Sequence, residues 1–353
     1  MIFLHLLTVQ NGGIKRSSLE VLSRGRELVD SICKSSGDSA ELHAVVCSPE
    51  VAGWDAAKWS AEIGVYNVDK VWSATDEAFK EHNNQALLSA VQSAHTQATG
   101  DGTKHSVIAM ASTEGVKDIL GALSMRLGAS VIADVSEFEI SAKNNGIQLN
   151  ATRPVMASKA QTKVQATANH VMVSVRSGSY GIIDQAALGS DGDYDANTIS
   201  HQHVSIEHTD SKLHTQIREI ITAAADTIDL NEAEAIVAAG RGVKDETAKA
   251  LIDELADLLN AGIGASRALT EAGVYDPSMQ IGQTGKVVSP QLYIAVGISG
   301  AIQHVAGITN SKVIVAVNKD ADAPIFEVAD YGIVGDLYEV LPALIAEIKR
   351  RKG

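Results

Sequence analysis

The sequence predicts an α/β protein with two domains, and three observations support this prediction. The chain has 353 residues, which corresponds to two domains at about 150 residues each. Hydrophobic residues make up 45% of the chain, aromatic residues only 4%, and 29 residues are glycine. An aliphatic core with many tight turns is typical of layered α/β proteins. Short aliphatic segments also alternate with helical patterns along much of the chain.

The first half of the chain has the order of strands and helices that builds an open parallel sheet. Strands are expected at Ile2–Val9, Leu42–Cys47, Lys70–Trp72, His105–Met110 and Val131–Val135. Helices are expected at Leu19–Ile32, near Ala56, at Asn83–Gln97 and at Gly115–Leu127. We therefore expect the N-terminal domain to be an open, mostly parallel sheet.

From Phe138 onward the apolar residues follow a period of two, which is typical of antiparallel strands with one buried face. They occupy alternate positions in two segments, at Ile147, Leu149 and Ala151 and at Val171, Val173 and Val175. The Asn144-Asn145-Gly146 segment has the composition of a hairpin turn. Both segments are expected to form an antiparallel appendage on the first domain.

Residues Ser177 to Ser211 are rich in small and polar residues and follow neither period, so we interpret them as a connecting arm. The expected domains are residues 1–222, which include this arm, and residues 223–353. The segment from 201 to 214 holds four histidines, at His201, His203, His208 and His214. No helical H-x-x-x-H pair and no nearby cysteine accompanies them, so no metal site is assigned.

Charge and hydropathy exclude two classes of function. The formal net charge of −14 argues against a nucleic-acid-binding surface, which needs a basic patch. No segment has the roughly 18 to 20 uninterrupted apolar residues of a membrane span. The start of the chain lacks the features of a secretory signal or a transit peptide, and the two cysteines fit a reducing compartment. A cytoplasmic protein is therefore expected.

The second half repeats a unit of strand, glycine turn and helix, with strands expected at Ala235–Ala239 and Leu292–Val296 and the first helix at Thr247–Leu259. The two turns are Gly240-Arg241-Gly242 and Gly297-Ile298-Ser299-Gly300, and the second is followed by a helix expected to begin at Ala301. Glycine lets the backbone approach a ligand closely, and the free N–H groups at a helix start favour an anion. A pyrophosphate site is the natural inference.

Three further polar segments are expected at the same edge of the second sheet. They are Gly262 to Arg267, the loop Gln280 to Lys286, and Asn318-Lys319-Asp320 at the end of a strand. Because open α/β sheets bind ligands at the carboxyl ends of their strands, these segments are expected to converge on one crevice.

In combination and in this order, the motifs of the second half resemble the flavin domain of the electron transfer flavoprotein alpha subunit. The matching segments are Gly240-Arg241-Gly242, Gly264-Ala265-Ser266-Arg267, Gln280 to Lys286, Gly297 to His304, Asn318-Lys319-Asp320 and Ala329 to Leu337. The resemblance is dense from Glu234 to Leu337 and weaker through the first domain, including Arg153-Pro154.

The resemblance implies a Rossmann-like, FAD-binding C-terminal domain and an N-terminal domain that contacts a beta subunit in a heterodimer. The implied FAD-binding residues are Arg241, Ser266, Arg267, Gln280, Ile281, Gly282, Gln283, Thr284, Ser299, Gly300, Ala301, Ile302, Gln303, His304, Asn318, Asp336 and Leu337.

The resemblance also implies individual roles for these residues. The segment Ser299 to Gln303 resembles the pyrophosphate cradle, and Asn318 and Asp336 resemble the ribose and adenine contacts. Three residues are expected to tune the redox chemistry of the flavin: Arg267 above the isoalloxazine ring, Thr284 as a donor toward N5, and His304 as a cation or donor near N1 and O2. Reduction adds negative charge to the ring, so positive groups beside it raise its potential.

The function that the resemblance implies is electron transfer rather than turnover of a substrate of its own. FAD accepts electrons from flavin dehydrogenases, such as the acyl-CoA dehydrogenases of fatty acid beta-oxidation, and passes them to a membrane quinone oxidoreductase. In a eukaryote the compartment would be the mitochondrial matrix. One alternative is a subunit of an electron-bifurcating flavoprotein that uses NADH and a low-potential acceptor such as ferredoxin. Another is an NAD-binding enzyme such as a deacylase, for which no zinc-type Cys cluster is found.

Overall fold

The structure of the chain is a computed structural model, and it divides into two compact units. It describes residues 1–10, 13–36, 39–48, 62–81, 83–100, 103–143, 146–156, 160–183, 199–206 and 228–352. One unit comprises Met1–Pro154 and Gln161–Glu219, and the other comprises Val155–Ala160 and Ile220–Gly353. The helix expected near Ala56, the Asn144-Asn145 part of the hairpin turn, and His208 and His214 lie outside the described residues.

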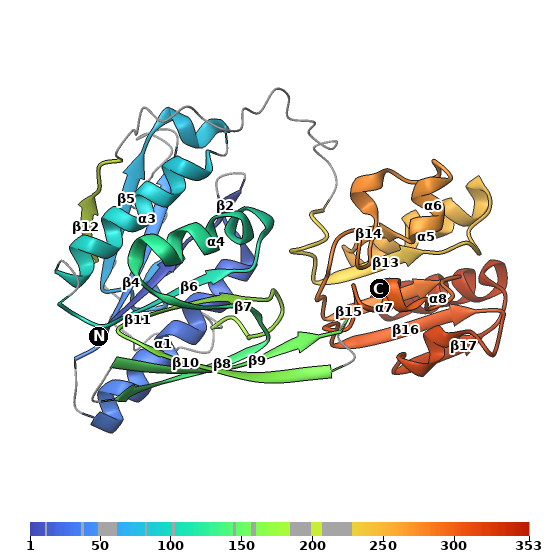
Figure 1. Cartoon of the computed structure of the whole chain (residues 1–353). Helices are drawn as coiled ribbons and strands as arrows, with labels where there is room; N and C mark the ends of the chain where they lie inside the picture. The colour runs from blue at the N-terminus through green and yellow to red at the C-terminus, as the bar shows by residue number, and fades with distance from the viewer. Residues whose placement is uncertain are drawn as a thin grey trace. The chain divides into compact units, whose positions relative to one another are not determined.

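The N-terminal unit is built on a seven-stranded sheet in the order β12-β5-β4-β1-β6-β11-β7 (Figure 1). Every neighbouring pair of strands in this sheet is parallel. The strands are β1 (Ile2–Leu6), β4 (Glu41–Ser48), β5 (Lys70–Thr75), β6 (Ser106–Ala111), β7 (Ser130–Val135), β11 (His170–Val175) and β12 (Ser200–His203). The parallel sheet predicted from the alternating pattern is confirmed.

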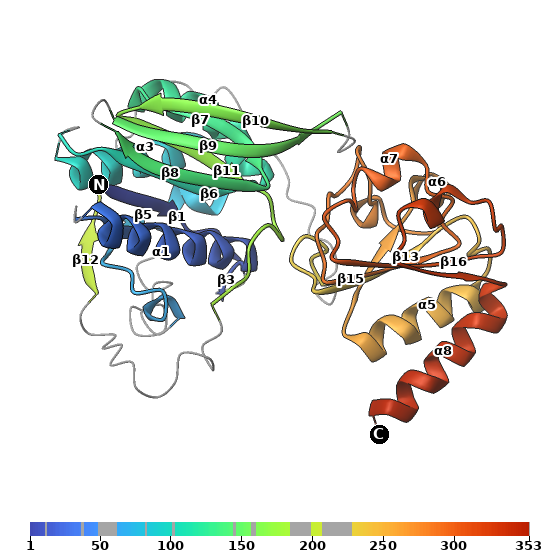
Figure 2. The same ribbon diagram turned by 90° about the horizontal axis from the view of Figure 1, so that it is seen from below.

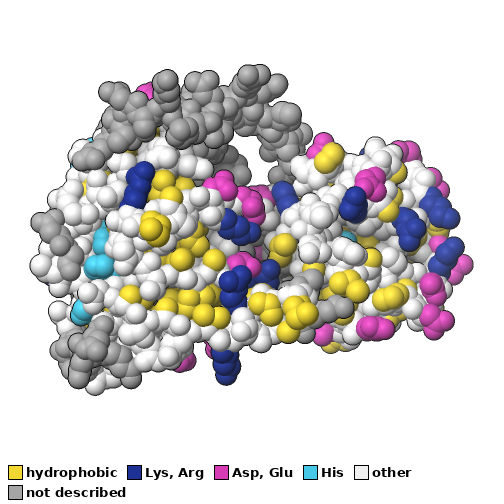
Figure 3. All heavy atoms as spheres, viewed as in Figure 1, with side chains coloured by type: hydrophobic (Ala, Val, Ile, Leu, Met, Phe, Trp, Pro, Cys, Tyr) yellow, Lys and Arg dark blue, Asp and Glu magenta, His cyan; other side chains and the backbone are white. Residues whose placement is uncertain are grey.

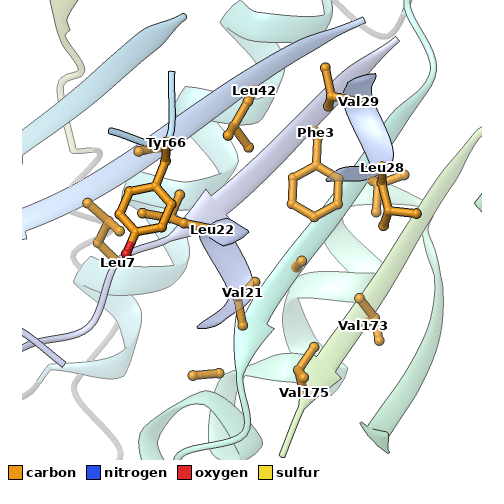
Figure 4. Packing of buried hydrophobic residues seen from close by; sticks show 14 of the residues in the cluster. Phe3, Leu7, Val21, Leu22, Leu28, Val29, Leu42, Tyr66, Val173 and Val175 are labelled. Carbon is orange, nitrogen blue, oxygen red and sulfur yellow. The ribbon is translucent and has the colours of Figure 1, made fainter. Parts of the chain in front are cut away.

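Helices cover both faces of this sheet, as Figure 2 shows. They are α1 (Arg16–Ser36) on one face and α3 (Asn84–Thr99) and α4 (Glu114–Leu127) on the other. Side chains of β1 alternate between the two cores, because successive residues of a strand point to opposite faces. Phe3 packs toward Leu28 and Val29 of α1 (Figure 4), whereas Leu4 belongs to the core under α3 and α4.

Two of these helices are capped at both ends: a polar side chain caps the start, and a glycine in the left-handed conformation caps the end. The Asn83 side chain accepts from two backbone N–H groups at the start of α3, and Thr113 accepts from one at the start of α4. Both helices end at a glycine with φ +60°, Gly100 and Gly128. Such caps satisfy backbone groups that a helix leaves unpaired, and glycine adopts this conformation without steric cost.

The appendage differs from the sequence prediction in one strand. Strands β8 (Glu137–Lys143), β9 (Gly146–Val155) and β10 (Ala160–Ala168) form a separate three-stranded sheet, and β8 pairs with β9 in antiparallel register. The predicted appendage strand at residues 171–175 is wrong, because β11 lies in the parallel sheet between β6 and β7. Met172 and Ser174, between its alternating valines, are also buried. The strand therefore has two buried faces, and the valine periodicity describes only one of them.

One segment of the predicted connecting arm forms a strand, which its composition did not predict. Residues Ser200–His203 form β12, the edge strand that pairs in parallel with β5, so His201 and His203 belong to a strand. Residues 184–198 and 207–227 of the arm region lie outside the described residues. Short elements complete this unit: β2 (Val9–Gln10), β3 (Gly13–Ile14) and the 3-10 helix η2 (Glu77–Glu81).

The C-terminal unit is a five-stranded parallel sheet in the order β14-β13-β15-β16-β17. Its strands are β13 (Ala235–Ala239), β14 (Gly262–Ala265), β15 (Leu292–Val296), β16 (Val313–Asn318) and β17 (Tyr331–Val334). Its helices are α5 (Glu246–Leu259), α6 (Arg267–Glu271), α7 (Ile302–Val305) and α8 (Leu337–Lys352), with 3-10 helices η5 (Pro277–Met279) and η6 (Pro324–Glu327). Helices α5 and α8 share the core on one face of the sheet.

The helix expected to begin at Ala301 is much shorter than a crossover helix, since α7 has only 4 residues. Just after α7, the backbone at Gly307 packs directly on the backbone of Gly282 in the loop Gln280 to Lys286. A Cβ added at Gly307 would lie 2.6 Å from the Cα of Gly282. The macrodipole of α7 is therefore small, because a helix dipole is the sum of many aligned peptide units.

Two properties of the surface follow from the described residues. No helix among them is both long and apolar enough to span a membrane. Acidic and basic side chains are interspersed on the face of the C-terminal unit that Figure 3 shows.

Candidate functional site

A pocket of about 330 Å³ lies at the carboxyl ends of β13, β14 and β15, where an open α/β sheet binds its ligands. Its volume falls in the roughly 300–1,000 Å³ range of small-molecule sites. The segments that line it follow three different strands or belong to the loop after η5. The convergence expected from the sequence is therefore observed.

Most residues implied by the resemblance line this one pocket. They are Arg241, Ser266, Arg267, Gln280, Ile281, Gly282, Gln283, Thr284, Ser299, Ala301, Gln303 and His304. The remaining five do not line it: Gly300, Ile302, Asn318, Asp336 and Leu337. Three lining residues were not expected, namely Ala268, Glu271 and Ile298. Ala268 directly follows the predicted Arg267 in α6, and Glu271 lies four residues after Arg267, so only the helical period could have indicated Glu271.

The glycine turns have a packing role that the sequence did not reveal. A Cβ at Gly240 would lie 2.2 Å from the carbonyl oxygen of Gly297, and one at Gly242 would lie 2.9 Å from the Gly297 Cα. Gly297 itself has φ +64°, a conformation that L side chains rarely adopt. These glycines let the turns after β13 and β15 pack backbone against backbone, which brings the two strand ends together.

The turn after β15 offers a group of unpaired donors. Within the described part of the chain, the backbone N–H groups of residues 300–303 have no hydrogen-bond acceptor. The side chains of Ala301, Ile302 and Gln303 are exposed. Consecutive free N–H groups form a concave site for an anion, so the short α7 keeps the donor set although its dipole is small.

Asn318 and Asp336 do not line the pocket, and each bonds to the backbone near the end of a strand. Asn318 donates from Nδ2 to the carbonyl oxygen of Ile298 at 2.9 Å and accepts from the Asp320 N–H at 3.0 Å. Asp336 accepts from the Tyr338 N–H at 3.0 Å at the start of α8. Asn318 therefore ties the end of β16 to the turn that carries the free donors.

Arg267 lies at the start of α6 and forms an ion pair with Glu271 one turn later. Its Nε is 2.7 Å from Glu271 Oε1, and the two side chains are 64% and 61% exposed. An exposed pair of this kind contributes about 0–1 kcal/mol, so it holds the guanidinium only weakly. Both residues line the pocket, and Arg267 can turn toward a ligand at little cost.

Thr284 is oriented by its neighbours in the loop. Gln280 donates from Nε2 to Thr284 Oγ1 at 3.1 Å, and the Oε1 of Gln280 accepts from Thr270 Oγ1 at 2.9 Å. Since a hydroxyl has a single proton and Thr284 uses its oxygen as the acceptor here, its O–H remains available to donate. The expected donor role of Thr284 is compatible with this network.

His304 is buried, with 7% exposure, and Tyr293 Oη lies 2.9 Å from its Nε2. Burial lowers the pKa of His304 to about 4, and the Ile281 backbone only partly opposes this shift. The imidazole is therefore neutral at neutral pH. Of the two roles expected for His304, the structure supports a neutral donor rather than a cation.

Two buried polar atoms among the lining residues lack partners. Ser266 Oγ and His304 Nδ1 make no hydrogen bond of normal geometry among the described residues. Buried polar groups are nearly always satisfied, and an unsatisfied one costs about 1–3 kcal/mol. Their position in the wall of a pocket indicates a polar ligand.

A parallel sheet with a polar pocket at the carboxyl ends of its strands is typical of nucleotide-binding α/β proteins, and comparison with known proteins specifies the nucleotide. Residues 229–309 match the electron transfer flavoprotein FAD-binding domain, and residues 4–194 match the electron transfer flavoprotein domain. FAD is therefore the cofactor of the C-terminal unit. Its phosphates and its isoalloxazine ring need anion-binding donors and polar side chains, which fits the free N–H groups and the unpartnered Ser266 and His304.

Individual relatives match over nearly the whole chain. The electron transfer flavoprotein subunit alpha of Bacillus subtilis is 35% identical over 342 residues, which cover 97% of this chain and 95% of that protein. The subunit alpha of Mycobacterium leprae is 40% identical over 72% of this chain and 75% of its own length. A probable mitochondrial subunit alpha of Cryptococcus neoformans is 37% identical over 82% of this chain and 78% of its own length. This chain belongs to the electron transfer flavoprotein subunit alpha family.

Proposed function

We propose that this chain is the alpha subunit of a heterodimeric electron carrier. Its FAD accepts electrons from flavin dehydrogenases, such as the acyl-CoA dehydrogenases of fatty acid beta-oxidation, and passes them to a membrane quinone oxidoreductase. The observation that carries this proposal is the single pocket in which Arg267, Thr284 and His304 meet. The carrier has no substrate of its own, and it works in the cytoplasm, or in the mitochondrial matrix of a eukaryote.

The two parts of the chain have different roles in this proposal. Residues 223–353 bind FAD, and residues 1–222 contact the beta subunit. The twelve predicted residues that line the pocket contact FAD, and the free N–H groups of residues 300–303 support a pyrophosphate there. Asn318 and Asp336 are proposed to contact the ribose and adenine at the edge of the site, and Leu337 is proposed to touch FAD beside Asp336.

Bound FAD supplies the one-electron and two-electron chemistry, and the protein sets its potential. The Arg267 guanidinium favours the negative charge that reduction places on the ring. Thr284 and His304 donate hydrogen bonds to ring heteroatoms, and these bonds strengthen as the acceptors gain charge. All three effects have the same sign, and together they raise the potential of the flavin.

Reconstitution of electron flow tests this function. The chain is co-expressed with its beta subunit, the FAD content of the purified complex is counted, and the complex is mixed with an acyl-CoA dehydrogenase and its substrate. The proposal predicts a yellow complex whose flavin absorbance bleaches only when dehydrogenase and acyl-CoA are both present, and recovers on adding the quinone oxidoreductase with quinone. Bleaching by NADH without dehydrogenase or acyl-CoA, together with reduction of ferredoxin that requires a high-potential acceptor to take the other electron, would establish the bifurcating alternative instead.

A further inference from the structure

The contacts of His304 are unequal on the two sides of its ring. Its Nε2 lies 2.9 Å from Tyr293 Oη, whereas its Nδ1 has no hydrogen bond of normal geometry among the described residues. The centroids of the Tyr293 and His304 rings are 6.2 Å apart, and the ring planes are tilted by 56° relative to each other. Tyr293 lies in the second position of β15 and has 0% exposure, so its hydroxyl is out of reach of solvent.

The position of the shared proton follows from counting buried donors and acceptors. Burial raises the pKa of Tyr293 well above its usual value, so the phenol keeps its proton. In the described part of the chain His304 is the only hydrogen-bond partner of that hydroxyl. If the imidazole donated from Nε2, both the phenol O–H and the Nδ1 lone pair would be buried without a partner. If the phenol donates, only the Nδ1–H needs an acceptor, and the Ile281 backbone beside the ring offers it a contact that falls short of normal hydrogen-bond geometry.

When the phenol donates, one buried polar group fewer is left without a partner, which lowers the free energy by about 1–3 kcal/mol relative to the other arrangement. Which nitrogen of a histidine carries the proton is set by the hydrogen bond that the other nitrogen makes. We propose that Tyr293 is a positioning residue that donates to Nε2 and thereby fixes His304 as the tautomer with its proton on Nδ1. This Nδ1–H is the donor that His304 offers to the bound flavin, an inference that rests on the proposed function.

The tautomer matters because the carbonyl oxygens and the unprotonated nitrogens of the flavin ring accept hydrogen bonds. They become stronger acceptors when reduction adds negative charge to the ring. The other tautomer would present a lone pair to them and would oppose the added charge. Tyr293 therefore acts on the flavin through His304, without contact between its own hydroxyl and the ring.

The first measurement is the tautomer itself. The full-length chain, in complex with its beta subunit, is labelled with nitrogen-15 in histidine, and the His304 signals are identified by their loss in His304→Gln. The imidazole nitrogen shifts are recorded for the FAD-free and the FAD-loaded complex. We expect Nδ1 to have the shift of a protonated nitrogen and Nε2 that of an unprotonated nitrogen in both samples. A protonated Nε2 in the FAD-free complex would overturn the proposal.

Tyr293→Phe tests the cause. It removes only the hydroxyl, so we expect the fraction of the Nδ1–H tautomer to fall, the flavin midpoint potential to drop, and the FAD dissociation constant to rise about threefold to tenfold, as for weakening one hydrogen bond. An unchanged tautomer in this variant would overturn the proposal.

Tyr275→Phe is the matched control. Tyr275 is also buried in the C-terminal unit, at 6% exposure, and its hydroxyl has no hydrogen-bond partner among the described residues. Burial raises the pKa of Tyr275 to about 12. This variant should leave the His304 shifts and the flavin potential unchanged. Equal changes in both variants would show a general packing effect and refute the positioning role.

The tautomer of His304 and the binding of FAD are tested independently of each other. The tautomer in the FAD-free complex does not depend on the flavin, so its result stands whatever binds in the pocket. If the wild-type complex holds no FAD, the proposed function fails, and with it the statement that Nδ1–H donates to a flavin.

Discussion

Each of the three polar side chains proposed to face the flavin ring is held by a different neighbour. Arg267 pairs with Glu271, Thr284 accepts from Gln280, and His304 shares a hydrogen bond with Tyr293. In each case the side chain still has a donor to offer to a ligand. Holding Thr284 and His304 in place before binding lowers the cost of ordering them when FAD binds, whereas the exposed pair with Glu271 holds Arg267 only weakly.

Arg267→Ala is expected to lower the flavin midpoint potential while FAD stays bound. Removing a cation makes electron addition less favourable. Because the side chain is 64% exposed, solvent screens its charge and we expect a change of about 1 kcal/mol, or about 40 mV for one electron. Spectroelectrochemical titration of the complex measures the change.

Arg351→Ala is the control for that substitution. Arg351 forms the same kind of pair, with its Nε 2.8 Å from Glu347 Oε1 four residues earlier, but it lies on α8 and does not line the pocket. Its removal should leave the potential where it is. If the Arg267 and Arg351 variants had the same potential as the wild type, the role assigned to Arg267 would be wrong.

Thr284→Val keeps the shape of the side chain and removes its donor. We expect weaker FAD binding by about threefold to tenfold, the loss typical of one hydrogen bond, and a lower flavin potential. Fluorescence titration of the FAD-free complex with FAD gives the affinity. Thr309→Val serves as the comparison, since Thr309 donates to the Val305 carbonyl at 2.8 Å outside the pocket. Indistinguishable affinities for the two variants would exclude Thr284 as a flavin donor.

Among the elements, the strands of the C-terminal sheet were predictable and the segments between them were less so. The strands at residues 235–239 and 292–296 have the predicted bounds, because short aliphatic runs bounded by glycine are typical of buried parallel strands. The length of α7 was not predictable, because it depends on the contact of Gly307 with Gly282. The same holds for β11, whose parallel neighbours lie far away in the sequence.

The contact between the two glycine turns makes a prediction about stability. Gly297→Ala would put a Cβ 2.8 Å from the Gly242 Cα on a backbone with φ +64°. We expect a loss of about 2–4 kcal/mol from left-handed strain and overpacking together, measured by urea unfolding with circular dichroism. At Gly121, inside α4, a Cβ meets nothing within 4 Å, and Gly121→Ala should stabilise by about 0.5–1 kcal/mol. Equal stability of the two variants would contradict the close packing of the turns.

At the scale of the whole molecule, buried histidines couple stability to pH. Burial lowers the pKa of His5 and of His95 to about 4, as it does for His304. Between pH 6.5 and 4 the unfolded chain therefore binds more protons than the folded chain does. The free energy of unfolding should fall as the pH drops through this window, by at most about 1.4 kcal/mol per pH unit for each group.

Urea unfolding at pH 7, 6 and 5 measures this dependence. Above pH 7 these histidines are neutral in both states and contribute no slope. His95→Gln should reduce the slope between pH 6 and 5, because it removes one group that must take up a proton on unfolding. A slope unchanged by this substitution, or stability that rises on acidification, would contradict the assignment.

The sequence predicted which residues line the pocket better than it predicted their protonation states and hydrogen bonds. Twelve of the predicted residues converge because the carboxyl ends of parallel strands share one edge. The neutral state of His304 and its bond to Tyr293 were not predictable, since they depend on burial and on a contact between a strand and a short helix. Within the sequence, Tyr293 has only the signal of a core residue in an aliphatic strand.

The most direct test of the central claim is a crystal structure of the FAD-loaded heterodimer. We predict the isoalloxazine ring in the pocket at the carboxyl ends of β13, β14 and β15, with Arg267, Thr284 Oγ1 and His304 Nδ1 beside its heteroatoms and the pyrophosphate on the N–H groups of residues 300–303. A flavin ring bound elsewhere, with these three side chains out of contact with it, would contradict the account.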